Sequence, residues 1–283
     1  MAPFSCRAHL AGSGIKSRFG IVADSHYADR NVQNNRYYRE SAGKMTECVK
    51  FMNRQKVDFL VELGDLKDQD NSPDEERTLS YLRAIEKCFR QFLGPRYHVL
   101  GNHDVDSISK EQFLENTVNT NVRSESTFYS FDSHGNHFIV LDANYRADGA
   151  AYDRGNFEWT DTHIPQSQLD WLKKDLAATS LPAIIFVHQQ LDGMGDLYVN
   201  NAGDVRQILQ DSGKVLAVFA GHKHEGDYNY MEGICYYTLK AMVDGSGLEN
   251  NSYAIVEVLN NRNIIVTGYR KAVSRELSEA VLS

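Results

Sequence analysis

The chain has 283 residues and a formal net charge of −8, with 42% hydrophobic and 24% charged residues, a composition that excludes a disordered protein. The acidic balance argues against duplex nucleic acid as a partner, because such binding usually needs a basic surface. No apolar run approaches the roughly 18 residues of a transmembrane helix, so we expect no membrane partner either.

The four cysteines, Cys6, Cys48, Cys88 and Cys235, are widely spaced and form no CxxC pair. We interpret them as buried thiols of a reducing compartment, while the even count leaves two disulfides open. Residues 1–14 lack the basic and apolar regions of a signal peptide, so we expect a flexible N-terminal extension and a cytoplasmic protein. A chain whose signal had been removed would look the same. No repeat or linker divides residues 1–283, which predicts one domain.

The first half of the chain alternates predicted strands with predicted helices. Short apolar runs predict strands over residues 19–23, 57–63 and 97–100. Apolar residues at helical spacing predict helices over residues 40–53 and 73–92, the second with Pro73 and three acidic residues suited to its first turn. This β-α-β-α-β order indicates parallel strands with helices packed on them.

The second half contains more strands. Residues 127–132 and 137–142 flank a His134-Gly135-Asn136 turn and predict a hairpin. Helices are expected over residues 166–176 and 205–210. Further strands are expected over residues 183–187, 215–220, 236–239, 253–259 and 264–269. The whole pattern predicts an α/β fold, a four-layer α/β/β/α sandwich of two mixed sheets flanked by helices.

Five polar clusters each follow the carboxyl end of a predicted strand, which is where open α/β sheets bind ligands. They are Asp24-Ser25-His26, Gly64-Asp65, Gly101-Asn102-His103-Asp104, His188 and Gly221-His222-Lys223-His224. We expect the glycines before Asp65, Asn102 and His222 to let the backbone turn sharply off each strand. Residues far apart in the sequence should therefore meet at one site.

These clusters contain enough ligand-type side chains for two divalent metal ions, if Asp65 bridges them. The candidate ligands are Asp24, His26, Asp65, Asn102, His188, His222 and His224. Imidazoles with a few oxygens and no thiolate suit a borderline divalent metal. Two such ions would leave the site net positive and able to hold a phosphate. Metals roughly 3.5–4 Å apart can also activate a water between them.

Taken singly, most of these clusters have an ordinary structural explanation. A lone Asp-x-His is usually a loop or a cap, and a lone histidine such as His188 is more often a hydrogen-bonded core residue. Gly-Asn-His-Asp and Gly-His-x-His after apolar strands are moderately specific. The order of all five at strand ends is what indicates a functional site.

In this order the motifs resemble those of the calcineurin-like metallophosphoesterase superfamily: D-x-H, GD, GNH-D/E, a lone H and G-H-x-H, over residues 19–224. The resemblance implies that one metal is held by Asp24, His26, Asp65 and His224. It implies that the other is held by Asp65, Asn102, His188 and His222. It further implies that His103 contacts the phosphate and protonates the leaving oxygen, with Asp104 orienting its imidazole.

Two positions bear on the branch of this family. Asp68 stands where purple acid phosphatases place a tyrosine ligand, which argues against iron(III) and favours Mn, Fe(II) or Zn. Residues 23–29 are similar to the manganese-dependent ADP-ribose/CDP-alcohol diphosphatase branch, which usually carries glutamine at the position of His26. His26 itself matches cyclic-nucleotide and glycerophosphodiester phosphodiesterases.

The substrate side is less well marked. Arg36, Tyr37 and Arg39 are candidate substrate-binding residues, because guanidinium groups suit phosphate and tyrosines can stack on a base or sugar. A solvated helix start is an equal alternative. The irregular segment 144–159 has the length of an active-site lid. We expect a small phosphate-bearing substrate, either a phosphodiester or a nucleotide diphosphate. The alternatives are a phosphomonoesterase and a metal-free scaffold, and the scaffold predicts missing ligands.

Overall fold

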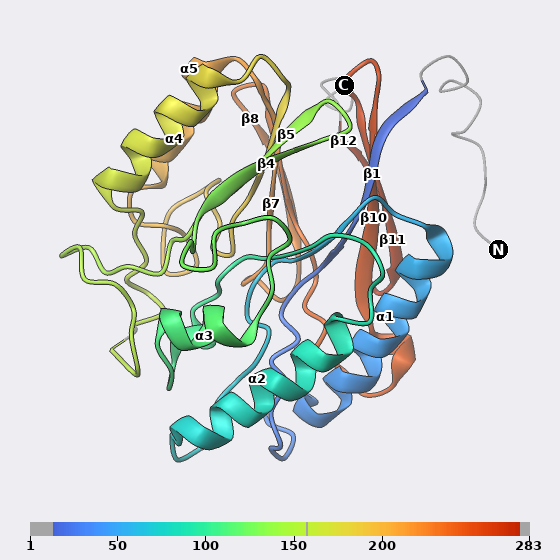
Figure 1. Cartoon of the computed structure of the whole chain (residues 1–283), viewed down its shortest axis with the longest axis vertical. Coiled ribbons are helices and arrows are strands. Elements are labelled where there is room, and N and C mark those ends of the chain that lie inside the picture. The colour runs from blue at the N-terminus through green and yellow to red at the C-terminus, as the bar shows by residue number, and fades with distance from the viewer. Residues whose placement is uncertain (1–13, 157, 278–283) are drawn as a thin grey trace.

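The structure, a computed structural model, describes residues 14–156 and 158–277. Two six-stranded sheets face each other at its centre, and helices cover their outer faces (Figure 1). The extension expected at residues 1–14 therefore lies, apart from Gly14, outside the described residues. No helix in the described part of the chain is long and apolar enough to cross a membrane.

The first sheet is mixed. In spatial order its strands are β12 (Arg275–Leu277), β11 (Ile264–Arg270), β10 (Ser252–Leu259), β1 (Ile15–Val22), β2 (Leu60–Glu62) and β3 (Arg96–His98). β1, β2 and β3 run parallel, whereas β10, β11 and β12 are joined by antiparallel pairing. The parallel half brings the carboxyl ends of β1, β2 and β3 to the same edge of the sheet.

The second sheet is mixed as well. Its strands in spatial order are β4 (Tyr129–Ser133), β5 (Asn136–Val140), β6 (Ala183–Phe186), β7 (Val215–Ala220), β9 (Ile234–Thr238) and β8 (Asp227–Met231). β5, β6, β7 and β9 are parallel, and β4 and β8 close the two edges in antiparallel pairing. The predicted hairpin is present as β4 and β5, with positive φ at His134 and Gly135 in its turn.

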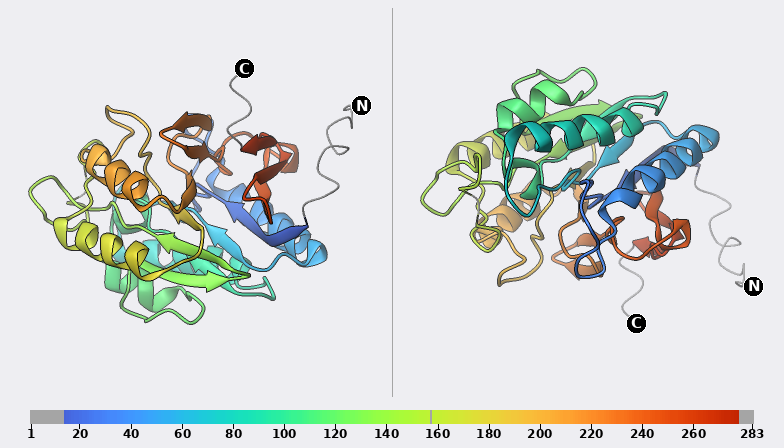
Figure 2. Two further views of the ribbon diagram at one scale, coloured as in Figure 1. Left: turned by 90° about the horizontal axis from the view of Figure 1, so that it is seen from above. Right: turned by 90° about the horizontal axis from the view of Figure 1, so that it is seen from below.

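The helices pack on the outer faces through apolar side chains. They are α1 (Ser41–Gln55), α2 (Glu75–Phe89), α3 (Lys110–Asn116), α4 (Gln166–Ala178) and α5 (Ala202–Ser212). One buried cluster joins α1 and α2 to the first sheet, and another joins α4 and α5 to the second. Seen from above and below, α4 and α5 lie across the two sheets from α1 (Figure 2).

The layer between the sheets is rich in phenylalanine. Phe19 of β1 stacks on Phe59 with ring centroids 4.9 Å apart, and Phe138, Phe186 and Phe219 of the facing sheet meet Phe19 edge-on. Burial of each such side chain stabilises the fold by roughly 1.5–3 kcal/mol. The core confirms the predicted four-layer α/β/β/α sandwich.

Three short elements, α3, β8 and β12, were not predicted from the sequence. Helix α3 has seven residues, too few for a clear helical period, and its capping box at Ser109 and Gln112 decides it locally. Strand β8 does alternate polar and aromatic residues, with the sequence DYNYM, but it is short and half-buried along its whole length, and this signal was overlooked. Strand β12 has three residues and exists through its pairing with β11.

The described cysteines, Cys48, Cys88 and Cys235, are free thiols. Cys48 and Cys235 are buried, as expected, and Cys88 is half-buried. The two-disulfide alternative therefore finds no pair among them, while Cys6 lies outside the described residues.

Candidate metal centre

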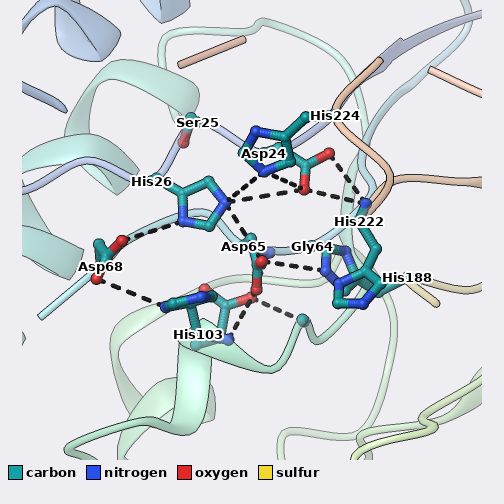
Figure 3. Close-up of polar contacts among 12 residues, drawn as sticks. Asp24, Ser25, His26, Gly64, Asp65, Asp68, His103, His188, His222 and His224 are labelled. Atoms are coloured by element: carbon teal, nitrogen blue, oxygen red, sulfur yellow. Dashed lines mark hydrogen bonds and ion pairs between the residues drawn. The ribbon is translucent and has the colours of Figure 1, made fainter. Parts of the chain in front are cut away.

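The predicted ligands converge at the carboxyl ends of β1, β2, β6 and β7 and of the segment that follows β3 (Figure 3). Four groups of three side chains have ligand atoms within 4.8 Å of one another. Two of them consist of predicted ligands alone: a first group of Asp24, His26 and His224, and a second group of Asp65, His188 and His222. Because parallel strands of both sheets end at this edge, motifs up to 200 residues apart in the sequence share one site.

The backbone turns off the strands in strained conformations. Asp24, His26, Asp65 and His222 have φ values of 54°, 43°, 57° and 66°, in the left-handed region that non-glycine residues rarely adopt. Such conformations cost of order 1–3 kcal/mol each and persist mainly at functional sites. Strain at four candidate ligands indicates that the fold holds these side chains in place for a purpose other than stability.

The neighbouring glycines differ from the expectation. Gly64 does turn the chain, with φ of 101°. Gly101 and Gly221 are not in the left-handed region, and what they provide is space: a Cβ on Gly101 would overlap Asp65, and one on Gly221 would lie 2.7 Å from Asp24 Oδ2. The sharp turn before His222 comes from His222 itself.

The first group surrounds the Nε2 atom of His26. This atom lies 3.2 Å from His224 Nε2, 3.3 Å from Asp65 Oδ2 and 3.9 Å from Asp24 Oδ1. Two imidazole nitrogens and two carboxylates that face one another at this spacing form a donor set for one divalent cation.

The second group contains unsatisfied polar atoms. His188 Nε2 lies 3.1 Å from Asp65 Oδ2. Asn102 Oδ1 and His222 Nε2 are buried and have no hydrogen-bond partner among the described residues. Buried polar atoms are normally paired, so these two atoms fit metal ligation together with His188 and with Asp65, whose Oδ2 atom also lies 3.3 Å from His26 Nε2 of the first group.

Protein acceptors hold the other side of three histidine rings. His26 Nδ1 lies 3.3 Å from Asp68 Oδ2, His188 Nδ1 lies 2.8 Å from the Leu63 carbonyl, and His224 Nδ1 lies 3.0 Å from Asp244 Oδ2. With Nδ1–H donating to these acceptors, each ring presents the Nε2 lone pair to the centre of the site, as is common for ligating histidines.

The electrostatics suit cations. Burial lowers the pKa of His26 to about 3, so that its imidazole is neutral. Burial alone would raise the pKa of Asp65, but His188 and His26 hold it well below its usual range. Burial also works against a charged His188, yet Asp65 and Asp24 raise its pKa to about 9. Metal binding at His188 therefore displaces a proton.

His103 lies beside this group, with its Nδ1 atom 3.5 Å from Asp68 Oδ1 and 3.7 Å from Asp106 Oδ2. Burial alone would lower the pKa of His103, but Asp68 and Asp65 raise it well above the ordinary value. The raised pKa favours the protonated ring, which is the form that can donate a proton. The Lys67 ammonium group pairs with Asp106 and donates to the His103 carbonyl, so it holds the Asp106 carboxylate and the His103 backbone in position.

Asp104 does not have the expected role. Its carboxylate accepts hydrogen bonds from the backbone N–H groups of Asp65, Leu66 and Gly101, each at 2.9 Å. It thereby joins the two strand-end loops to each other. The carboxylates beside the His103 ring are Asp68 and Asp106, because the 3-10 turn at His103–Val105 directs Asp104 back into the fold.

Two cavities open from the candidate metal centre. One, of about 600 Å³, is lined by polar side chains that include Arg30, Gln33 and Asn71. The other, of about 510 Å³, is lined by Trp159, Leu197 and Lys223. Arg36, His103, His224 and Glu225 border both cavities. The two cavities therefore adjoin beside the candidate metal centre.

Of the three predicted substrate-binding residues, only Arg36 lines these cavities. Arg39 pairs with Asp29 and Asn31 at the surface, and its side chain is half exposed. Tyr37 lines neither cavity. Arg36 and Arg39 are three residues apart in the sequence, so we expected both at the same site. The chain turns between them where the 3-10 helix at Tyr38–Glu40 begins, and their side chains therefore have different surroundings.

The chain is similar to known proteins along most of its length. The model of the family described as calcineurin-like phosphoesterase matches residues 17–226. A manganese-dependent ADP-ribose/CDP-alcohol diphosphatase from Oryza sativa subsp. japonica is 24% identical, over 80% of this chain and 83% of the relative. A human protein of the same name is 22% identical, over 87% of this chain and 88% of the relative.

Solved structures show the same fold. The crystal structure of a dimetal phosphatase from Danio rerio has a TM-score of 0.79 at 19% identity, covering 94% of this chain and 99% of that one. A purple acid phosphatase from yellow lupin has a TM-score of 0.65 at 13% identity, covering 92% of this chain and 52% of that one.

Proposed function

Because the chain belongs to the calcineurin-like phosphoesterase family, which confirms the resemblance of its motifs, we propose that it is a two-metal enzyme that hydrolyses nucleotide diphosphates. One divalent cation would be held by Asp24, His26, Asp65 and His224. The other would be held by Asp65, Asn102, His188 and His222. Manganese is the ion named for the rice and human relatives, and the donor set suits Mn as well as Zn or Fe(II).

The substrate class rests on one observation: two adjoining cavities with different linings border the candidate metal centre. A phosphomonoester places a large group on one side of its phosphorus only. A diphosphate or phosphodiester places groups on both sides and would occupy both cavities. The diphosphatase names of the relatives support the diphosphate reading.

The metal ions and two side chains of the chain would each have a separate role in the reaction. The metal ions, when bound, neutralise the phosphate and acidify the attacking water. Arg36, which borders both cavities, binds a phosphate oxygen through its guanidinium group. His103, held between Asp68 and Asp106, gives its proton to the leaving oxygen.

The test is a substrate panel on protein loaded with Mn: ADP-ribose, CDP-choline, cyclic AMP, bis-p-nitrophenyl phosphate and p-nitrophenyl phosphate. We expect the highest kcat/KM on ADP-ribose or CDP-choline. A higher kcat/KM on p-nitrophenyl phosphate than on every diester and diphosphate would instead identify a phosphomonoesterase. Absence of turnover with two Mn ions bound would identify a scaffold.

The shared ligand can be tested separately. Metal analysis should find about two ions per chain, and Asp65→Ala should reduce the number because both sets lose a ligand. Asp175→Ala is the matched control. Asp175 also contacts a histidine, His137, but this histidine lies near the start of β5, at the end of the second sheet opposite to the candidate metal centre. An unchanged metal content in Asp65→Ala would refute the bridging assignment.

A further inference from the structure

Trp159 lies at the edge of the cavity of about 510 Å³, which we call the Trp159 cavity. Its side chain is 44% exposed, and its ring centroid lies 6.4 Å from that of His222, a proposed metal ligand. A large aromatic side chain in this position is not part of the core. An indole face next to a catalytic centre offers a flat apolar surface to a substrate.

The rest of the Trp159 cavity has complementary chemistry. Leu197 adds a second apolar surface, and the charged lining consists of Arg36, Lys223, which pairs with Asp227, and Glu225, so that Arg36 is the cation left to meet an anionic group. Asp65, Asn102 and His222 line its inner end. A ligand that is flat and apolar at one end and anionic at the other matches this arrangement.

The two apolar walls are held together by hydrogen bonds. The Tyr152 hydroxyl donates to the carbonyls of Glu158, at 2.6 Å, and Asp161, at 2.9 Å, on either side of Trp159. Asn200, three residues after Leu197, donates through its backbone N–H to the Thr162 carbonyl and through its side chain to Asp161, both at 2.8 Å. The walls therefore form one pre-organised unit, which reduces the entropy lost on binding.

The adjoining cavity beside the candidate metal centre lacks an accessible aromatic face. Its aromatic lining residue is Tyr38, which is 3% exposed and carries the Arg30 guanidinium 4.6 Å above its ring. Its remaining lining is polar and includes Gln33, Asn34 and Asn71. This cavity suits a sugar or a small alcohol, so the two ends of a substrate would be distinguished.

We propose that the Trp159 cavity is the nucleobase subsite of this enzyme, with the indole ring of Trp159 as the stacking surface. The inference rests on the proposed hydrolysis of nucleotide diphosphates and adds the orientation of the substrate: the nucleoside monophosphate half has its base at Trp159, and the other phosphate ester, such as phosphocholine or ribose 5-phosphate, lies in the polar cavity. Stacking on an indole accepts purines and pyrimidines alike, because every base has a π-face.

The composition of the chain allows a direct binding test. The sequence contains two tryptophans, Trp159 and Trp171, and Trp171 packs against Phe128, with ring centroids 5.0 Å apart, on α4. In the variant Trp171→Phe, Trp159 is the only tryptophan, so the tryptophan emission reports on Trp159 alone. In the Mn-loaded variant, AMP and CMP should quench its emission, whereas ribose 5-phosphate, which has a phosphate and no base, should not.

Kinetics provide the second test. Trp159→Ala should raise KM for CDP-choline and ADP-ribose by roughly 5- to 150-fold, the range given by base–aromatic stacking. Trp159→Phe should fall between this variant and the wild type, because it retains an aromatic face. Tyr152→Phe should also raise KM, since it removes the hydroxyl that fixes the segment around Trp159.

The outcomes separate the two proposals. If CDP-choline is hydrolysed but AMP quenches no more than ribose 5-phosphate and Trp159→Ala leaves KM unchanged, the nucleobase subsite is wrong and the proposed function stands. If no diphosphate is hydrolysed while AMP still quenches Trp159 selectively, the cavity binds bases and the proposed reaction is wrong. Selective quenching together with a raised KM would support both.

Discussion

Asp244 should control metal affinity although it is not a proposed ligand. Its Oδ2 atom lies 3.0 Å from His224 Nδ1, so it fixes the orientation of a ring whose Nε2 faces the first metal position. Removing such a partner of a ligating histidine typically weakens metal binding 10- to 100-fold, which corresponds to about 1.4–2.8 kcal/mol. We expect Asp244→Ala to weaken one Mn site by this amount, and Asp244→Asn to weaken it less, because the amide oxygen can still accept the hydrogen bond.

The loop that carries Asp244 should survive the substitution. The buried ammonium group of Lys44 donates to the carbonyls of Met242, at 2.8 Å, and Gly245, at 2.6 Å, and Lys271 donates to the carbonyl of Asp244. These bonds go to backbone atoms and do not involve the Asp244 side chain. The melting temperature of the metal-free variant should therefore stay close to that of the wild type.

Titration of metal-free protein with Mn by calorimetry, or by competition with a chromophoric chelator, measures the two binding steps. Asp175→Ala is the control, because Asp175 Oδ2 lies 2.8 Å from His137 Nε2 in a similar carboxylate–histidine pair outside the candidate metal centre. Two wild-type Mn affinities in Asp244→Ala, with a normal melting temperature, would refute the reasoning.

Three further predictions concern single residues. His103→Ala should lower kcat about 10²–10⁴-fold on a substrate with an alkyl or sugar leaving group, and much less on a p-nitrophenyl ester; equal losses would mean that His103 is not the acid. Arg36→Ala should lower kcat/KM on diphosphates, whereas Arg39→Ala should not, which steady-state kinetics of the two variants will decide. Burial would lower the pKa of His98, but Glu86 and Glu62 raise it to about 9. The protonated His98 therefore adds to the free energy of unfolding in full below its unfolded pKa near 6.5, and this stabilisation is lost as the pH rises through 9. Denaturant titrations of metal-free protein should therefore show a free energy of unfolding that falls as the pH rises from 6.5 through 9, and His98→Gln should make this slope shallower.

Much of the fold was readable from local patterns. The helices at α1, α2, α4 and α5 were predicted from apolar spacing, and their ends moved by a few residues only. The strands with continuous apolar runs, such as β7, were also predicted correctly. Two short strands were missed: β12 has three residues and is defined by its pairing with β11, whereas β8, which pairs with β9, does alternate polar and aromatic residues and was overlooked.

The candidate ligands were also visible in the sequence. Each lies immediately after an apolar strand, and the strand-end position is a local property that a pattern of residues can encode. The predicted convergence is what the structure shows for Asp24, His26, Asp65, His188 and the histidines after β7, while their division between two ions stays a prediction.

The sequence by itself determined the strand-end motifs, the family and the sandwich, because all three follow from short stretches whose hydrophobicity and residue types are local. Tertiary structure alone decided which groups surround those motifs. Asp68 and Asp106 took the place expected for Asp104 beside His103, and Asp244 reached His224 from a loop 20 residues away. Trp159 lies beside His222 in a segment that is hydrogen-bonded through Asp161 to Asn200. Contacts of this kind join separate segments of the chain, and no local pattern of residues specifies them.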